Sequence, residues 1–298
     1  MKRSPLVVVF SCVLLNALAA RAWELPSQSP TDLVRATVQH ELEIAQRGAK
    51  FLFLEHKVTQ NGSQTRIIVE TREMMAGMLV AVNDQPLSPD QRQAEYARVQ
   101  RFVDDPGERR KRARQEKEDA DRTKRIMVAL PDAFLYQWDG TEPGSDKVGT
   151  PGRDLVRLKF SPNPKYSPPS NVEQTLTGMQ GSVLIDTADH RIAKIEGTLF
   201  KEVGFGWGIL GHLDRGGHFM VQLADIGGGN WEVTQMDLAL TGKALFFKTI
   251  NFSSVNVFSD FRPAPSGLSV AEGIELLKKE EAAMLASNRH APLDDQKP

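Results

Sequence analysis

Residues 50–83 read KFLFLEHKVTQNGSQTRIIVETREMMAGMLVAVN, and this stretch decides the fold. Its apolar residues fall into three short segments, Lys50–Thr59, Gln64–Glu73 and Gly77–Asn83, with the spacing typical of strands. Asn61-Gly62 separates the first two segments and is a strong hairpin signal, because both residues accept the positive φ that a tight turn requires. Three strands joined by short turns predict an antiparallel meander.

The predicted strands are apolar on both faces. Phe51 and Phe53 lie on one face of their strand and Leu52 and Leu54 on the other, and the run 245–247 shows the same opposition. Both faces of such a sheet must be covered. Helices would cover one face, and the curved wall of the sheet itself could enclose a cavity for an apolar ligand on the other. A plain helix-covered core fits the same pattern, so both interpretations stay open.

Helices are expected on either side of this meander. Thr31-Asp32 opens an amphipathic pattern that ends at Gly48, and Ser88-Pro89-Asp90-Gln91 is a capping box with proline at the first helical position. The second helix runs to about Val103, is interrupted at 104–107, and resumes through Met127. A third helix begins at the Ser269 capping box and runs to about Ala286.

The remaining sequence is rich in strand patterns. Further strands are expected at 133–138, 154–160, 181–186, 191–200, 217–226, 230–240, 243–250 and 254–261. Thr241-Gly242-Lys243 is interpreted as a turn, and the proline-dense segment 161–170 as a loop at a rim. A sheet of about ten strands must curl. The prediction is an α+β fold: one large curled antiparallel sheet, an open half-barrel, with helices on its concave side.

The N-terminus has the pattern of a secretory signal peptide. A basic start precedes an apolar run from Leu6 to Ala20, which ends in the small-residue site Ala20-Arg21-Ala22. The run is short for a membrane-spanning helix, although a retained anchor is the alternative. Cys12 is the only cysteine and lies inside this run, so the mature chain would have no disulfide. We therefore expect a signal peptide over 1–22, export to the periplasm or beyond, one domain over 23–286 with a charged helical insertion at about 88–128, no transmembrane segment in the mature chain, and a disordered tail over 287–298.

Charge excludes one class of partner. The chain has 37 Lys and Arg against 38 Asp and Glu, a formal net charge of −1, so it lacks the basic excess that holds proteins on nucleic acid. The local run Arg109–Arg112 is followed by interleaved acids from Glu116 on. This pattern favours a solvated helix face with internal ion pairs over a nucleic-acid patch.

No catalytic motif withstands inspection. Gly206–Gly211 matches the dinucleotide-binding pattern in letters, but hairpins surround it where a helix would have to follow. His212, Asp214 and His218 could ligate a metal if a turn gathered them, yet no recognised spacing supports this. The sequence therefore predicts a non-enzymatic protein without a cofactor or a metal site.

Several segments resemble a known group of proteins. Gly181-Ser-Val-Leu-Ile-Asp186 followed by Arg191-Ile-Ala-Lys-Ile-Glu196 is similar to a hairpin of the periplasmic lipoprotein-carrier superfamily, which includes the lipoprotein-sorting carriers. The resemblance covers roughly 31–262. It implies an open, curled sheet whose concave side holds helices and binds acyl chains. The charged insertion at 104–125 and the segment 204–217 depart from the small carriers. The segments FGWGILG (205–211) and PNP (162–164) also resemble an uncharacterised exported bacterial family, which supplies no function.

These observations lead to an expected function. The chain is expected to be a periplasmic carrier or binding protein for a lipid or an acylated ligand, with 161–170 as a gate. The alternative is an envelope interaction or regulatory module with a filled core, which docks on a partner protein through the helix at 108–127. The candidate ligand-binding residues are the large aromatic side chains Phe51, Phe53, Trp207, Trp231 and Phe247.

Overall fold

One curled antiparallel sheet organises the protein. The computed structural model describes residues 28–45, 48–205, 211–244 and 248–290. Thirteen strands join in a single sheet with the order β4-β3-β2-β1-β13-β12-β11-β8-β7-β6-β5, to which the short strands β10 and β9 add beside β12. Among the described residues no strand links the two edges, so the sheet stays open. The expected α+β class with a curled sheet is confirmed, with more strands than the ten foreseen.

The longest strands, β12 and β13, are neighbours in the middle of the sheet, and the shortest, β4, lies at one edge. Their bounds are β1 Phe51–Thr59, β2 Gly62–Glu70, β3 Met75–Val82, β4 Gln85–Pro86, β5 Phe134–Pro143, β6 Asp154–Pro162, β7 Met179–Asp186, β8 Arg191–Leu199, β9 Val203–Phe205, β10 Gly211–Leu213, β11 His218–Asp225, β12 Trp231–Ala244 and β13 Lys248–Pro263. The helices are α1 Pro30–Ile44, α2 Pro89–Asp104, α3 Pro106–Ala133, the short α4 Asn171–Gln174 with a 3-10 turn at Thr175–Gly178, and α5 Val270–His290.

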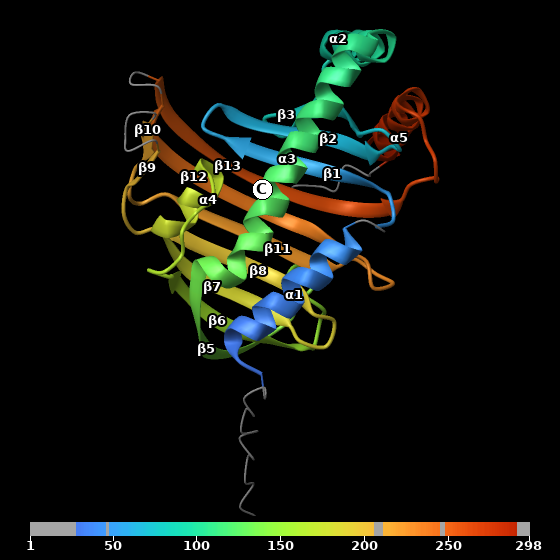
Figure 1. The fold of residues 1–298 in the computed structure, drawn as a ribbon. Helices are drawn as coiled ribbons and strands as arrows, with labels where there is room; N and C mark the ends of the chain where they lie inside the picture. Colours follow the sequence, from blue (N-terminus) through green and yellow to red (C-terminus); the bar gives the residue numbers. More distant parts are fainter. Residues whose placement is uncertain (1–27, 46–47, 206–210, 245–247, 291–298) are drawn as a thin grey trace, which may run out of the picture.

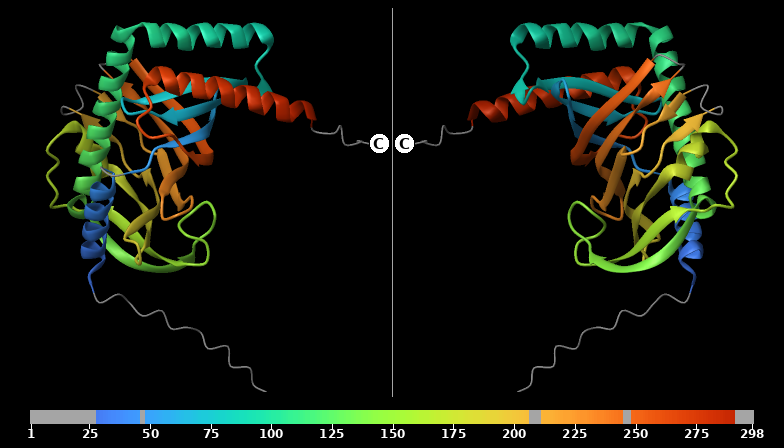
Figure 2. Two further views of the ribbon diagram at one scale, coloured as in Figure 1. Left: turned by 90° about the vertical axis from the view of Figure 1, so that its right-hand side faces the viewer. Right: turned by 90° about the vertical axis from the view of Figure 1, so that its left-hand side faces the viewer.

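Local sequence signals set most of these bounds. The Ser88 hydroxyl and the Gln91 side chain form the predicted capping box at the start of α2. Asp105 ends α2 and caps α3, where its carboxylate accepts the N–H groups of Gly107 and Glu108. The two helices therefore meet at a sharp corner (Figure 2). Gly62 turns the β1–β2 hairpin with a φ of 113°.

Helices cover both faces of the sheet. We call the face against α1 and α3 the inner face; α3 crosses it from β3 to β5 (Figure 1). There Leu33, Val38 and Leu130 pack on Leu158 and Ile185 of the strands. On the opposite, outer face, α5 packs on β2 and β3. It buries strand side chains such as Ile67 and Met78, which alternate along each strand with the residues that point to the inner face. The placement of helices on the concave side therefore holds for α1 and α3, whereas α5 adds a layer on the other side.

The structure differs from the expectation at Thr241-Gly242-Lys243, which is not a turn. Strand β12 continues through it, pairing with β13 on one side and with β10 on the other. The reason is the glycine: a Cβ at Gly242 would overlap the carbonyl oxygen of His212, so the close approach of β10 requires its absence. Consequently residues 243–244 end β12, whereas 248–250 begin β13, which also contains the segment 254–261.

Other boundaries shift for reasons of packing. Helix α3 continues past Met127 to Ala133, with Pro131 in its last turn, because Ala129, Leu130 and Ala133 are buried in the core of the inner face. Strand β8 carries a bulge, so Ile195 faces inward while Ala193 packs in an outer cluster, which breaks the expected alternation. Helix α5 extends to His290, four residues into the segment expected to be disordered.

The predicted signal peptide and Cys12 lie outside the described residues. Within the described part of the chain, none of the helices has the length and apolar character needed to cross a bilayer.

Candidate functional site

A cavity of about 770 Å³ lies between the inner face and the corner formed by α2 and α3. Its volume falls within the range of about 300–1,000 Å³ seen for small-molecule sites. Strands β1, β2, β3, β12 and β13 form its floor, and both helices form its other wall. The lining side chains and backbone come from Phe53, Glu55, Lys57, Gln64, Arg66, Ile68, Met75, Gly77, Leu79, Glu95, Arg98, Val99, Phe102, Arg112, Met236, Asn256 and Phe258.

One end of this cavity is apolar. Phe53 pairs across the strands with Ile68, and its ring lies 6.0 Å from that of Phe258 and 5.3 Å from that of Phe261. Phe102 of α2 faces this group from the helix side. The apolar wall is incompletely covered, because Met75 remains 44% exposed. Flexible methionines at such a wall adapt to ligands of different shape.

Carboxylates tie the helices to the edge of the sheet. Glu95 of α2 is 7% exposed and accepts the Leu79 N–H of β3 at 2.8 Å, while Arg98 binds both of its oxygens at 2.6 and 2.7 Å. Glu116 of α3 likewise accepts the Met75 N–H at 3.1 Å. These bonds occupy donors that an edge strand would otherwise leave open, and they fix the helical wall of the cavity.

The structure separates the aromatic residues that the sequence brought together. Phe53 lines the cavity, and Phe51 lies buried beside it, packing edge-on against Phe261 without reaching the cavity. Trp231 lies in a different cluster with Leu155 and Ala193, where Arg191 stacks 5.3 Å from its ring. Trp207 and Phe247 lie outside the described residues.

The expected gate also lies elsewhere. In the segment 161–170, Asn163 donates to the carbonyl of Asp132, and Tyr166 packs on the inner core near the end of α3. No residue of this segment lines the cavity.

The polar lining of the cavity escaped sequence analysis. The signal was the placement of Glu55 and Lys57 on the same strand face as Phe53, but their partners on β13 are distant in the chain.

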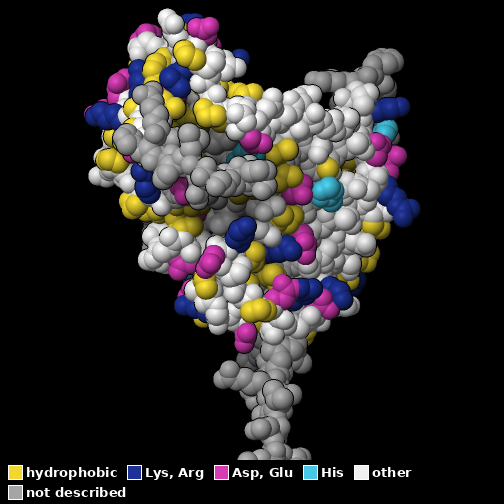
Figure 3. Space-filling model, turned by 180° about the vertical axis from the view of Figure 1, so that it is seen from behind, with side chains coloured by type: hydrophobic (Ala, Val, Ile, Leu, Met, Phe, Trp, Pro, Cys, Tyr) yellow, Lys and Arg dark blue, Asp and Glu magenta, His cyan; other side chains and the backbone are white. Residues whose placement is uncertain are grey.

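A second hollow of about 770 Å³ lies on the outer face over β5–β8, β11 and β12. Only strands line it, and its charges are paired: Lys159 with Asp139 at 2.7 Å, and Lys194 with Glu196 at 2.7 Å. Figure 3 shows this face with basic and acidic side chains interspersed. It has the character of a wet sheet face, and we place the candidate site in the inner cavity instead.

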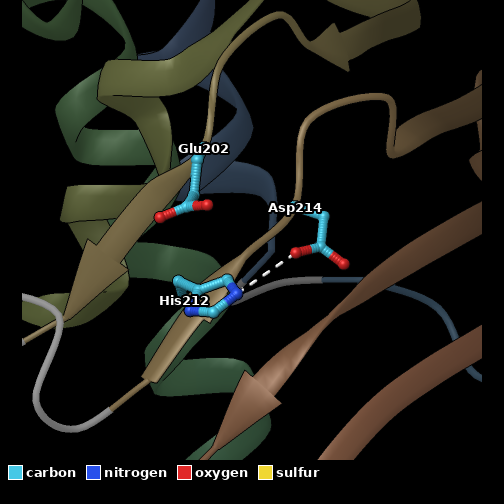
Figure 4. A group of neighbouring side chains, drawn as sticks. All are labelled: Glu202, His212 and Asp214. Carbon is cyan, nitrogen blue, oxygen red and sulfur yellow. Dashed lines mark ion pairs between the residues drawn. The ribbon is translucent and has the colours of Figure 1, made fainter.

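Two of the three metal-ligand candidates do meet. His212 Nε2 lies 3.2 Å from Asp214 Oδ1, and Glu202, the residue before β9, points toward them (Figure 4). His218 instead pairs with Asp237 at 3.3 Å. Glu202 could have been foreseen from strand pairing, because the antiparallel β9–β10 register sets Val203 opposite Leu213 and so places the neighbouring residues Glu202 and Asp214 at the same end of the pair. Within the described chain no fourth donor of this kind joins the group, so we assign no metal to it.

Glu232, outside the cavity, makes stability depend on pH. Burial raises the pKa of Glu232 from its usual 4.5 to about 7; the Glu70 carboxylate adds to the rise, and Arg191 and Lys50 oppose it. The folded state therefore binds this proton more tightly than the unfolded chain does, so the free energy of unfolding falls as the pH rises from about 4.5 through 7.

We expect Glu232→Gln to remove this fall in the free energy of unfolding at higher pH. At pH 8 the variant should be more stable than the wild type by ~1–2 kcal/mol, a value reduced for solvent screening, and at pH 4.5 the two should match. Urea unfolding at both pH values measures the difference. An equal gain at both would contradict titration of Glu232 as the cause.

Comparison with known proteins adds little. No protein-family profile and no curated protein matches the sequence. A solved structure of a DUF1329 family protein from Desulfovibrio piger aligns with 82% of this chain and 98% of its own, at 11% sequence identity and a TM-score of 0.24.

Proposed function

We propose that this chain is a non-enzymatic binding protein of the bacterial envelope that holds a lipid or an acylated ligand in the inner cavity. The observation that supports this function is the apolar end of the cavity. Phe53, Ile68 and Phe258 form a continuous floor under α2, and Met75 stays exposed although it is apolar. An acyl chain lying there would remove this surface from water, which contributes about 25 cal/mol per Å² of apolar area.

The first experiment is native mass spectrometry of the mature protein purified from an envelope fraction, followed by lipid extraction. A co-purifying acyl species supports the proposal. A clean apo mass, together with no uptake of a fluorescent fatty acid, would contradict it.

A cavity-filling variant provides the sharper test. Gly77 lies on the floor beside Ile68, and a Cβ added there would lie 3.6 Å from the Ile68 side chain, an ordinary contact. Gly77→Phe should therefore fold and occupy the apolar end of the cavity. We expect it to weaken binding of the fluorescent fatty acid about tenfold or more, as measured by titration.

Gly48→Phe is the matched control, because a Cβ added there would meet nothing within 4 Å and the residue is exposed. It should bind as the wild type does. If Gly77→Phe folds with the wild-type melting temperature and still binds with unchanged affinity, the ligand does not lie in this cavity.

The alternative function, docking on an envelope protein, uses the exposed face of α3. Ion pairs within α3 link side chains along the helix, such as Arg112 with Glu116 at 3.0 Å and Lys117 with Asp121 at 2.9 Å. Charge reversal at Arg110, Arg114 and Lys117, which are exposed and do not line the cavity, would abolish partner capture if docking is the function, and would leave acyl binding unchanged if the cavity is the site.

A further inference from the structure

Two polar groups on the cavity floor are left unused by the protein. Lys57 of β1 and Asn256 of β13 are direct cross-strand partners, and both line the cavity. Asn256 Oδ1 is buried and has no hydrogen-bond partner in the described structure. Over the same residues, no ion pair or side-chain hydrogen bond involves the Lys57 ammonium. A buried acceptor without a partner costs stability, so such groups call for an explanation.

The other charged groups of the cavity are engaged. Arg98 holds Glu95, Arg112 bonds Glu116 at 3.0 Å, and Arg66 lies 3.8 Å from Glu55. Glu55 is the acid nearest to Lys57 along the same strand face, and its charge is offset by Arg66. The lining contains four basic side chains, Lys57, Arg66, Arg98 and Arg112, against two acidic ones, Glu55 and Glu95. The surplus positive charge therefore includes the unpaired ammonium of Lys57.

Polarity changes in steps along the strands. Phe53, Ile68 and Gly77 form one cross-strand row, and Lys57 with Gln64 and Asn256 forms another. Four residues of a strand separate these rows, a distance of about 13 Å. The apolar row lies at the end where Arg98 of α2 donates to the Gly77 carbonyl, so the helical wall covers it. The floor thus matches a molecule with an apolar chain at one end and a polar head at the other.

We propose that the cavity selects an anionic single-chain amphiphile. Its acidic oxygen would pair with the Lys57 ammonium, and a hydroxyl or amide N–H beside the acid would donate to Asn256 Oδ1. The acyl chain would extend over Phe53 and Ile68 under α2. Charge-assisted bonds of this kind are the stronger class of hydrogen bond, and a head that lacks the acid would forgo them. This inference rests on the proposed function, since it assigns the head group of a ligand whose chain fills the same cavity.

The test compares three probes by calorimetric titration, each below its critical micelle concentration. Myristoyl lysophosphatidic acid carries chain, phosphate and hydroxyl; monomyristoylglycerol lacks the phosphate; glycerol 3-phosphate lacks the chain. We expect lysophosphatidic acid to bind the wild type about tenfold or more tightly than monomyristoylglycerol, and glycerol 3-phosphate to bind far more weakly than either. The preference should shrink as salt is added.

Variants test which residues cause the preference for the phosphate-bearing probe. Lys57→Met should reduce the preference for the phosphate to near unity while leaving the affinity for monomyristoylglycerol unchanged. Lys159→Met, which changes a strand lysine on the outer face, should keep the preference. Asn256→Leu should weaken both acyl probes several-fold with a melting temperature at or above that of the wild type, because the orphan acceptor is removed.

The outcomes distinguish failure of the head-group assignment from failure of the acyl-binding function. If both acyl probes bind but Lys57→Met keeps the preference for the phosphate, the head-group assignment is wrong and the acyl-binding function stands. If neither acyl probe binds, both proposals fail. If glycerol 3-phosphate binds as tightly as lysophosphatidic acid, the site is a simple anion site, and the amphiphile is excluded.

Discussion

Replacing Glu95 with alanine is expected to lower the free energy of unfolding by about 3 kcal/mol, as for the loss of one partner of a buried charged pair. The Glu95 carboxylate is buried where α2 meets the sheet. Its removal leaves the Leu79 N–H of the edge strand without its acceptor and the Arg98 guanidinium without its counterion. Urea unfolding followed by far-UV circular dichroism measures the change.

Glu118→Ala is the control for this prediction. Glu118 lies on the solvated face of α3 and pairs with Arg114 at 3.9 Å, with both side chains more than half exposed. Exposed pairs contribute about 0–1 kcal/mol, so this variant should be close to the wild type. Similar losses in the two variants would show that Glu95 acts as a general surface charge and does not anchor α2.

The Glu95 prediction also bears on the cavity. Because α2 forms one wall of it, loosening α2 should weaken acyl binding even where the floor is intact. In Glu95→Ala we therefore expect binding and stability to fall together, whereas in Gly77→Phe only binding should fall. The two variants thus distinguish the contribution of the helical wall to binding from that of the strand floor.

Local chemistry allowed much of this fold to be predicted. The Ser88 capping box, the Asn61-Gly62 hairpin and the break at Asp105 each depend on a few neighbouring residues, and all three lie where the sequence indicates. The predicted turn at Thr241-Gly242-Lys243 is wrong because Gly242 serves a distant strand. Its missing Cβ makes room for the backbone of His212, a contact that no local pattern encodes.

In the candidate site, too, features set by neighbouring residues were predictable and contacts between distant strands were not. Phe53 could be named from its strand alternation, since burial on one face follows from period two. Lys57 and Asn256 could not be paired in advance, because 199 positions along the chain separate two residues that the β1–β13 register sets side by side. Trp231 belongs to an outer cluster because a bulge and the loop before β6 create a small core there. The register between strands distant in the chain could thus not be predicted from local sequence patterns.

Gly181→Ala is expected to destabilise the protein by ~3 kcal/mol or more, or to prevent folding altogether. Gly181 and Gly197 lie directly opposite each other on β7 and β8. A Cβ at Gly181 would overlap the Glu196 carbonyl oxygen and come within 2.6 Å of the Gly197 Cα, and both atoms belong to backbone that cannot turn aside. Paired glycines of this kind let neighbouring strands approach and the sheet bend.

Gly77→Ala is the matched control for Gly181→Ala, because it adds the same methyl group to a strand of the same sheet. Its Cβ would meet only ordinary contacts, at 3.6 Å and beyond. We expect it to be neutral or to stabilise the fold by up to about 1 kcal/mol, since alanine restricts the unfolded chain. Soluble yield and urea unfolding of the two variants give the comparison. If both were equally stable, the backbones of β7 and β8 would have room to move apart at this point, and the curl of the sheet would have to originate elsewhere, at the bulges of β5 and β8.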